Sequence, residues 1–132
     1  MEKENLKTLI VDDHMIMRNV VEKHINAMGI RNVTFAVNGR EAAEKAQQET
    51  FDIILADWNM PELSGEDLLK KIRDDIKYNK SAFVMISAEG EKTKILDVMN
   101  AGATAYLTKP FSEGEFQDTI SNVISWLEKK RN

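Results

Sequence analysis

Short apolar runs rich in β-branched residues alternate with helical patterns along the whole chain. We expect strands near residues 6–11, 33–36, 52–56, 82–87 and 104–107. Strand–helix alternation of this kind is typical of a parallel sheet covered by helices on both faces. The sequence therefore predicts a doubly wound α/β domain, a (βα)5 fold with the flavodoxin-like strand order 2-1-3-4-5.

The first two helical patterns have recognisable ends. We expect the first helix over about 15–28 and Gly29 as its stop, because glycine readily adopts the left-handed conformation that ends many helices. Asn38 is a suitable N-cap for a second helix near 39–49. The apolar face of this second helix contains only Ala42, Ala43 and Ala46.

The remaining three helices are predicted in the same way. Ser64 or Gly65 begins the third, and the fourth covers 91–101. Ser112 caps the fifth, with Glu115 completing a capping box. The apolar residues expected on these helices are Leu68, Leu69, Ile72 and Ile76, then Ile95, Leu96 and Met99, then Phe116, Ile120, Val123 and Leu127.

The composition fits a single cytoplasmic domain over residues 1–132 without an output domain. The 132 residues, 42% of them hydrophobic, are enough for one core, and no linker or repeat divides them. The lack of cysteine excludes disulfides and thiolate metal sites. No apolar run reaches the roughly 18 residues of a membrane span, and the charged N-terminus is unlike a secretory signal. A net charge of −4 without a basic stripe argues against nucleic-acid binding.

Polar residues stand at the carboxyl ends of four of the predicted strands. Asp12 and Asp13 follow the first strand and Asp57 the third, while Ser87 and Lys109 come at the ends of the fourth and fifth. Right-handed crossovers bring these ends to one rim of the sheet, where doubly wound folds bind their ligands. We therefore expect three carboxylates, a hydroxyl and an ammonium group in one pocket.

The three carboxylates are suited to a divalent cation, which would offset their mutual repulsion. Mg²⁺ prefers hard oxygen ligands, and Mn²⁺ or Ca²⁺ could substitute for it. Asp13 and Asp57 could bind the ion directly and Asp12 through a water, with the backbone carbonyl of Asn59 completing the protein's share. Imidazole is a poor ligand for Mg²⁺, so we expect a loop or cap role for His14.

The same pocket is suited to phosphoryl transfer. A carboxylate can attack phosphorus to form an acyl phosphate, and Asp57 is the best-placed nucleophile because its strand lies between the first and the fourth. Lys109 could ion-pair with one phosphoryl oxygen, and Ser87 could donate a hydrogen bond to another.

The motifs around these residues resemble the receiver domain of two-component response regulators over almost the whole chain. They are Val11-Asp12-Asp13, then Asp57-Trp58-Asn59-Met60-Pro61 followed by Gly65, then Ser87-Ala88 and Lys109-Pro110-Phe111. The tetrad after Asp57, together with Tyr106, is most similar to stand-alone chemotaxis regulators of the CheY type. A chemotaxis regulator is itself a known example of the strand order expected above.

The resemblance implies a role for each of these residues. Asp57 would be the phosphoacceptor, and Ser87 and Lys109 would bind the phosphoryl group. The ligands of Mg²⁺ would be Asp12, Asp13, Asp57 and the Asn59 carbonyl. Ser87 would then move toward the phosphate and Tyr106 would turn inward, which would switch the surface of the fourth helix, fifth strand and fifth helix. The resemblance also implies a cis bond between Lys109 and Pro110.

The resemblance further implies partners and a limited chemistry. A histidine kinase of the CheA type, or a small phosphodonor, would supply the phosphate to a monomeric signalling switch. The protein would catalyse only its own phosphorylation and dephosphorylation. Asn59 and Glu89 flank the expected path of the hydrolytic water, so we expect them to tune the lifetime of the phosphoryl group.

The last helix differs from that of the motor-binding members, which commonly carry lysines on its exposed face. Thr119 and Asn122 occupy the corresponding positions here, and Glu113, Glu115 and Asp118 lie nearby. An acidic face would bind an acidic flagellar-switch peptide less well. This difference favours another downstream target, or a phosphate sink, over the flagellar switch.

Two functions from other classes fit parts of the pattern. A metal-dependent phosphohydrolase of the haloacid dehalogenase type would also use Asp57 as nucleophile, but it needs an acid where Asn59 stands, and a cap domain. An adaptor of receiver-like fold would bind partners without phosphate. The full set of acids, hydroxyl and lysine argues against the adaptor, which needs none of them.

Overall fold

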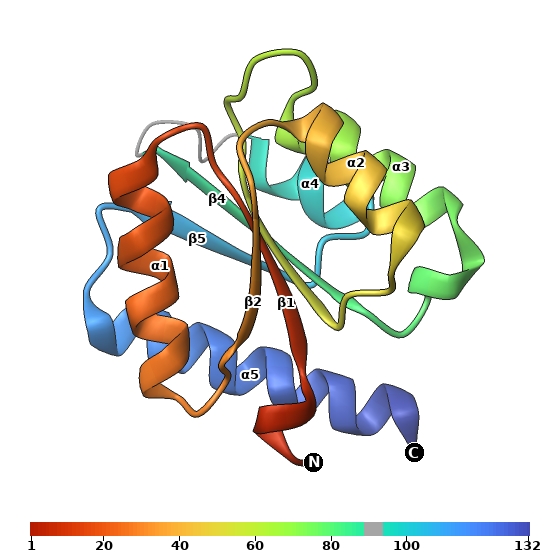
Figure 1. The fold of residues 1–132 in the computed structure, drawn as a ribbon. Coiled ribbons are helices and arrows are strands. Elements are labelled where there is room, and N and C mark those ends of the chain that lie inside the picture. Colours follow the sequence, from red (N-terminus) through yellow and green to blue (C-terminus); the bar gives the residue numbers. More distant parts are fainter. Residues whose placement is uncertain (89–93) are drawn as a thin grey trace.

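The computed structural model describes residues 1–88 and 94–132 (Figure 1). Its centre is a five-stranded sheet of the order β2-β1-β3-β4-β5, with every neighbouring pair parallel. The strands are β1 (Lys7–Val11), β2 (Asn32–Ala36), β3 (Ile53–Asp57), β4 (Ala82–Ala88) and β5 (Ala105–Lys109). The predicted fold class and strand order are therefore confirmed.

The helices form a layer on each side of the sheet, with α1 and α5 on one face and α2, α3 and α4 on the other (Figure 1). Their bounds are α1 (Met15–Ala27), α2 (Gly39–Gln48), α3 (Gly65–Asp74), α4 (Ile95–Asn100) and α5 (Glu113–Arg131). Two short 3-10 helices, η1 (Lys3–Asn5) and η2 (Ile76–Tyr78), complete the described elements. Within the described ranges, no helix combines the length and the apolar character of a membrane span.

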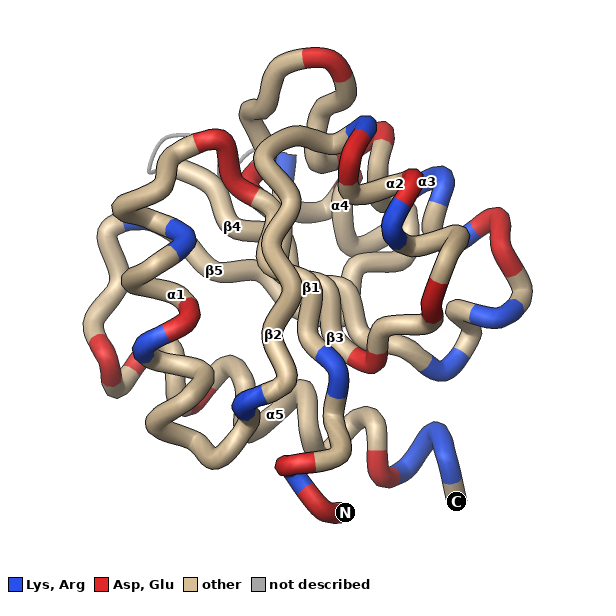
Figure 2. The backbone as a smooth tube through the Cα atoms, in the orientation of Figure 1, with Lys and Arg blue, Asp and Glu red and all other residues tan. Residues whose placement is uncertain are grey.

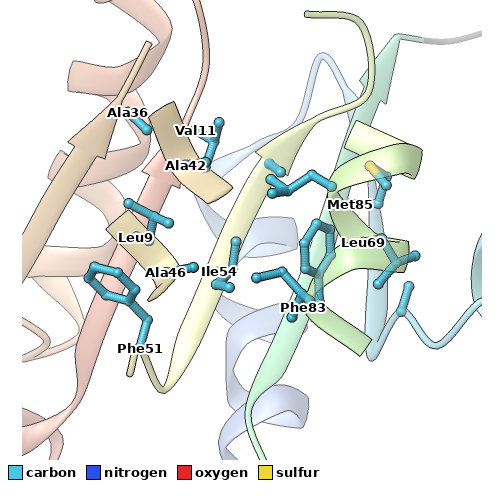
Figure 3. Close-up of a cluster of buried hydrophobic side chains, with 14 of the residues drawn as sticks. Leu9, Val11, Ala36, Ala42, Ala46, Phe51, Ile54, Leu69, Phe83 and Met85 are labelled. Carbon is cyan, nitrogen blue, oxygen red and sulfur yellow. The ribbon is translucent and has the colours of Figure 1, made fainter. Parts of the chain in front are cut away.

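The side chains of the central strands alternate between two cores. Leu9 and Ile54 pack with α2 and α3 on one side of the sheet (Figure 3), whereas Ile10 and Leu55 pack with α1 and α5 on the other. Full burial of one such side chain contributes about 1.5–3 kcal/mol. The alanine-rich face of α2 fits this arrangement, because Ala46 lies beside Leu9 and Ile54 in the first core.

Polar caps fix the starts of three helices. The side chain of Asn38 accepts a hydrogen bond from Glu41 N at 2.8 Å, and Ser64 Oγ accepts one from Asp67 N at 3.1 Å. Ser112 and Glu115 form the predicted capping box at α5. Each cap contributes on the order of 1 kcal/mol and sets where the preceding loop ends.

Three elements, α3, α4 and β5, differ from the prediction in where they end or in which side chains they bury. Ile76 was expected on the apolar face of α3 but lies in η2 with 80% of its surface exposed, because α3 ends at Asp74 and Asp75 is extended. In α4 the fully buried side chain is Val98, whereas the predicted Leu96 and Met99 are exposed. Strand β5 runs two residues past the predicted 104–107, so Lys109 ends the strand itself.

Candidate phosphoacceptor site

All five of the predicted strand-end residues meet at one rim of the sheet. Asp57 is the last residue of β3, and its Oδ1 lies 3.3 Å from Lys109 Nζ at the end of β5. The same ammonium group is 3.7 Å from Asp12 Oδ2 beyond β1. Ser87 lies in β4 directly between these strands, and Asp13 follows Asp12 in the loop. The register of the parallel strands therefore brings together residues that are almost a hundred positions apart.

The acidic part of the rim has the chemistry of a divalent-cation site. One ligand atom from each of Asp12, Asp13, His14 and Asp57 lies within 4.8 Å of the others. Three of the four donors are carboxylates, which fits a hard ion such as Mg²⁺. Asp12 and Asp57 are buried while Asp13 is more exposed, so the pocket opens to solvent on the Asp13 side.

Burial of the Asp57 carboxyl is the main reason for its raised pKa. The ammonium group of Lys109 lowers this pKa, and the negative charge of Asp12 raises it again. Only 7% of Asp57 is exposed, so water solvates its charge poorly. A carboxyl group with these perturbing neighbours at a sheet rim is typical of a functional site.

The loop after Asp57 returns closely to the end of β3. Trp58 N donates to Ile86 O, and Gly65 N donates to Trp58 O, both at 2.8 Å. A Cβ on Gly65 would lie 2.4 Å from the carbonyl oxygen of Asp57, a distance that no real side chain accommodates. Glycine at this position therefore allows the loop to pack closely against the end of β3 at Asp57.

Ser87 and Tyr106 form the other side of the pocket. The Ser87 side chain is fully buried, and its hydroxyl hydrogen-bonds with the hydroxyl of Tyr106. The Tyr106 ring is half-buried and lies edge-on to Trp58, with 6.5 Å between centroids. Tyr106 thus already points inward in this structure. Trp58 is only 5% exposed, because the Tyr106 ring and Lys94 lie against it.

Sequence reasoning predicted some features of the rim and missed others. The bond between Lys109 and Pro110 is cis, as expected. His14 occupies the N-cap position of α1, as expected, but its ring also contacts both neighbouring aspartates. Arg18 was missed, and its guanidinium donates to Asp12 O at 2.8 Å. A basic residue one turn into the helix after an acid pair was the available signal. Glu89 lies outside the described residues.

Comparison with known proteins identifies the family. The response regulator receiver domain profile matches residues 8–121, which is most of the chain. This chain belongs to the response regulator receiver domain family. The receiver domain is 35% identical to the chemotaxis protein CheY1 of Helicobacter pylori over 90% of this chain and 97% of that protein. It is 34% identical to the chemotaxis protein CheY-3 of Vibrio cholerae, over 94% of this chain and 95% of that protein.

Solved structures agree with this assignment. The chemotaxis response regulator CheY4 of Vibrio cholerae matches the receiver domain with a TM-score of 0.82 and 33% identity, covering 89% of this chain and 98% of that one. The receiver domain of sensor histidine kinase PA1611 from Pseudomonas aeruginosa matches with a TM-score of 0.79 and 26% identity, covering 93% and 98% of the two chains. That structure has a magnesium ion coordinated in its active site cleft.

Proposed function

We propose that this receiver domain is a stand-alone response regulator in chemotaxis signalling, switched by phosphorylation of Asp57. The observation that carries the proposal is the contact of the buried Asp57 carboxylate with Lys109 at 3.3 Å, beside a second carboxylate on Asp12. The similarity to chemotaxis proteins over nearly their full length supports the assignment to chemotaxis. A single domain over residues 1–132, located in the cytoplasm, is part of the proposal.

The acidic pocket would hold Mg²⁺, with Mn²⁺ or Ca²⁺ as substitutes. The ligands in this proposal are Asp12, Asp13, Asp57 and the backbone carbonyl of Asn59. When bound, the ion would offset the charge of the carboxylates and of a phosphoryl oxygen. The donor set supports the proposal because three carboxylates converge there, and a related receiver domain binds magnesium in its active site cleft.

Asp57 would act as the nucleophile of the phosphorylation step. One of its carboxylate oxygens would form a bond to phosphorus, while the bond from phosphorus to the leaving group breaks and its electron pair departs with that group. Lys109 would stabilise a phosphoryl oxygen with its ammonium charge, from a position already beside Asp57. The Ser87 hydroxyl would donate to another oxygen once it leaves Tyr106. Asn59 and Glu89 would tune the lifetime of the product.

The contact between Ser87 and Tyr106 would couple the phosphate to the surface. A hydroxyl that turns toward the phosphate breaks its bond with Tyr106, so that the ring and β5 adjust together. The surface of α4, β5 and α5 would then change its affinity for a downstream protein. A histidine kinase of the CheA type, or a small phosphodonor, would supply the phosphoryl group to the monomer.

The α5 surface supports a downstream target other than the flagellar switch, or a phosphate-sink role. Glu113, Glu115 and Asp118 are exposed near its start, and Thr119 and Asn122 stand where motor-binding relatives commonly have lysines. Acidic side chains repel an acidic peptide. Titration of the phosphorylated protein with a flagellar-switch peptide would refute this part of the proposal if the affinity were micromolar.

Intact-mass measurement with acetyl phosphate and Mg²⁺ tests the main proposal. We expect an adduct of about 80 Da on the wild-type protein, dependent on the divalent cation, and its loss in Asp57→Asn. Asp52→Asn is the matched control, because Asp52 lies at the opposite end of β3 and bonds Arg131 and Lys7 N. An adduct that persists in Asp57→Asn would refute Asp57 as the acceptor.

A further inference from the structure

The imidazole of His14 is part of the acidic pocket. Its Nδ1 lies 3.2 Å from Asp12 Oδ1 and 3.1 Å from Asp13 Oδ1. Donor atoms that share one metal ion at about 2.1 Å lie about 3.0 Å apart in octahedral and about 3.4 Å apart in tetrahedral coordination. The distances from His14 Nδ1 to the two carboxylate oxygens therefore match those between ligands of one ion, and Asp57 supplies a further donor within 4.8 Å.

The backbone holds His14 in this place. His14 N donates to Asp12 Oδ1 at 2.9 Å, and His14 O accepts the first helical hydrogen bond of α1 from Arg18 N at 3.1 Å. The guanidinium of Arg18 is bonded in turn to Asp12 O. The side chain itself is 71% exposed, so an incoming ion can reach it from solvent. The imidazole is thus anchored through its own backbone and remains accessible.

The His14 imidazole changes which ions the pocket should prefer. Mg²⁺ takes oxygen ligands and keeps several waters, so it gains little from an imidazole. Zn²⁺ and Co²⁺ bind imidazole and carboxylate together, and late first-row ions generally bind such mixed sites more tightly than early ones. We infer that His14 makes the pocket selective for late first-row divalent ions such as Zn²⁺, which compete with Mg²⁺ for the same carboxylates.

This inference rests on the proposed function, because the same aspartates hold the ion in both. It adds a metal-dependent regulation of the site, since an ion that displaces Mg²⁺ controls whether Asp57 is ready for phosphorylation. The rest of the chain offers little competition for Zn²⁺. There is no cysteine, and the one other histidine, His24, packs on α1 against Phe116 with 5.4 Å between ring centroids.

Calorimetric titration of the full chain with Zn²⁺, Co²⁺ and Mg²⁺, each alone and at one pH, tests the inference. His14→Gln keeps a polar side chain but removes the imidazole, and His24→Gln is its matched control. We expect His14→Gln to weaken Zn²⁺ and Co²⁺ at least about tenfold and to change Mg²⁺ affinity by less than about twofold. We expect His24→Gln to leave all three affinities unchanged.

Nuclear magnetic resonance of the ring nitrogens gives a second readout on the wild-type protein, without any substitution. Zn²⁺ should shift the His14 Nδ1 resonance and leave that of His24 in place, whereas Mg²⁺ should shift neither strongly. An unshifted His14 nitrogen at saturating Zn²⁺, or an equal loss of Zn²⁺ and Mg²⁺ affinity in His14→Gln, would overturn the inference. Failure of Mg²⁺ to bind the wild-type protein would instead count against the proposed function.

Discussion

The two halves of the pocket rim differ in how completely their side chains are buried. The acceptor half consists of β3 and the loop after it, where every residue of the strand is buried and the loop is tied back at Trp58 and Gly65. The switch half consists of β5 and α4, beside the largely buried strand β4. In β5 only Leu107 is buried, and in the described α4 only Val98.

This difference fits the separate tasks that the proposed function gives to the two halves. A nucleophile and its cation need donors that stay in place, because positioning supplies most of the catalysis of phosphoryl transfer. A switch needs an element whose alternative arrangements differ little in free energy, and few buried apolar contacts provide that. The comparison predicts that equivalent substitutions lower the free energy of unfolding strongly in the acceptor half and weakly in the switch half.

The largest expected difference is between two apolar truncations. Ile54→Ala removes a fully buried side chain from the middle of β3 and should lower the free energy of unfolding by about 2–5 kcal/mol. Leu96→Ala removes a side chain on α4 that is mostly exposed and should change it by about 0.5 kcal/mol or less. Urea unfolding of both variants measures this, and equal losses would contradict the proposed division.

Gly65→Ala should cost less than the core truncation but still disturb the acceptor loop. The added Cβ meets the Asp57 carbonyl oxygen and Met85 Sδ, so the loop must shift at a cost of about 1–3 kcal/mol. Gly114→Ala is the control, because its Cβ meets only Ser112 Oγ at 3.9 Å and alanine favours the helix by up to about 1 kcal/mol. Thermal unfolding should therefore move in opposite directions for the two variants, and a Gly65→Ala protein as stable as wild type would refute the close packing.

The residues at the strand ends were the part of the rim that the sequence predicted best. Asp12, Asp57 and Lys109 follow apolar runs, and parallel topology places all such ends together whatever the details of packing. The burial of Trp58 was not predictable in this way. It depends on the Tyr106 ring from β5 and on Lys94 before α4, contacts that no local pattern contains.

The end of α3 and the position of the His14 ring were not predictable for similar reasons. Ile76 continues the four-residue spacing of Leu68 and Ile72, so the pattern alone does not show that the chain turns at Asp75. The contact of the His14 ring with the aspartates depends on a side-chain rotation, which spacing does not determine. The parts set by topology were therefore predictable, and the parts set by side-chain packing were not.

Tyr106→Phe should have a smaller effect, confined to the switch half. It removes the hydroxyl that pairs with Ser87, which leaves the buried Ser87 hydroxyl with a long contact of 3.5 Å to Ala88 O. We expect a loss of about 1 kcal/mol in the free energy of unfolding. The wavelength and the intensity of Trp58 emission should change little in Tyr106→Phe, because the edge contact between the two rings remains. The fluorescence spectrum measures this. A loss of the size seen for core truncations would show that the switch half is more rigid than proposed.

The smallest expected effect concerns the charge on Asp57 in the acceptor half. The pKa of Asp57 lies above its ordinary value of 3.8, chiefly because the carboxyl is buried, so the folded chain holds this proton more tightly than the unfolded chain. The free energy of unfolding therefore falls as the pH rises from the pKa of Asp57 in the unfolded chain to its higher pKa in the folded chain. At neutral pH the ionised carboxylate destabilises the fold.

Asp57→Asn removes that cost while Lys109 keeps Asp12 as a partner at 3.7 Å. Without divalent cations, we expect the variant to be slightly more stable than wild type at about pH 7.5, with the difference shrinking as the pH falls toward about 4. Urea unfolding at several pH values measures the difference. A variant less stable than wild type at neutral pH would mean that the ion pair with Lys109 outweighs burial, and that the acceptor half is held together by its charge rather than in spite of it.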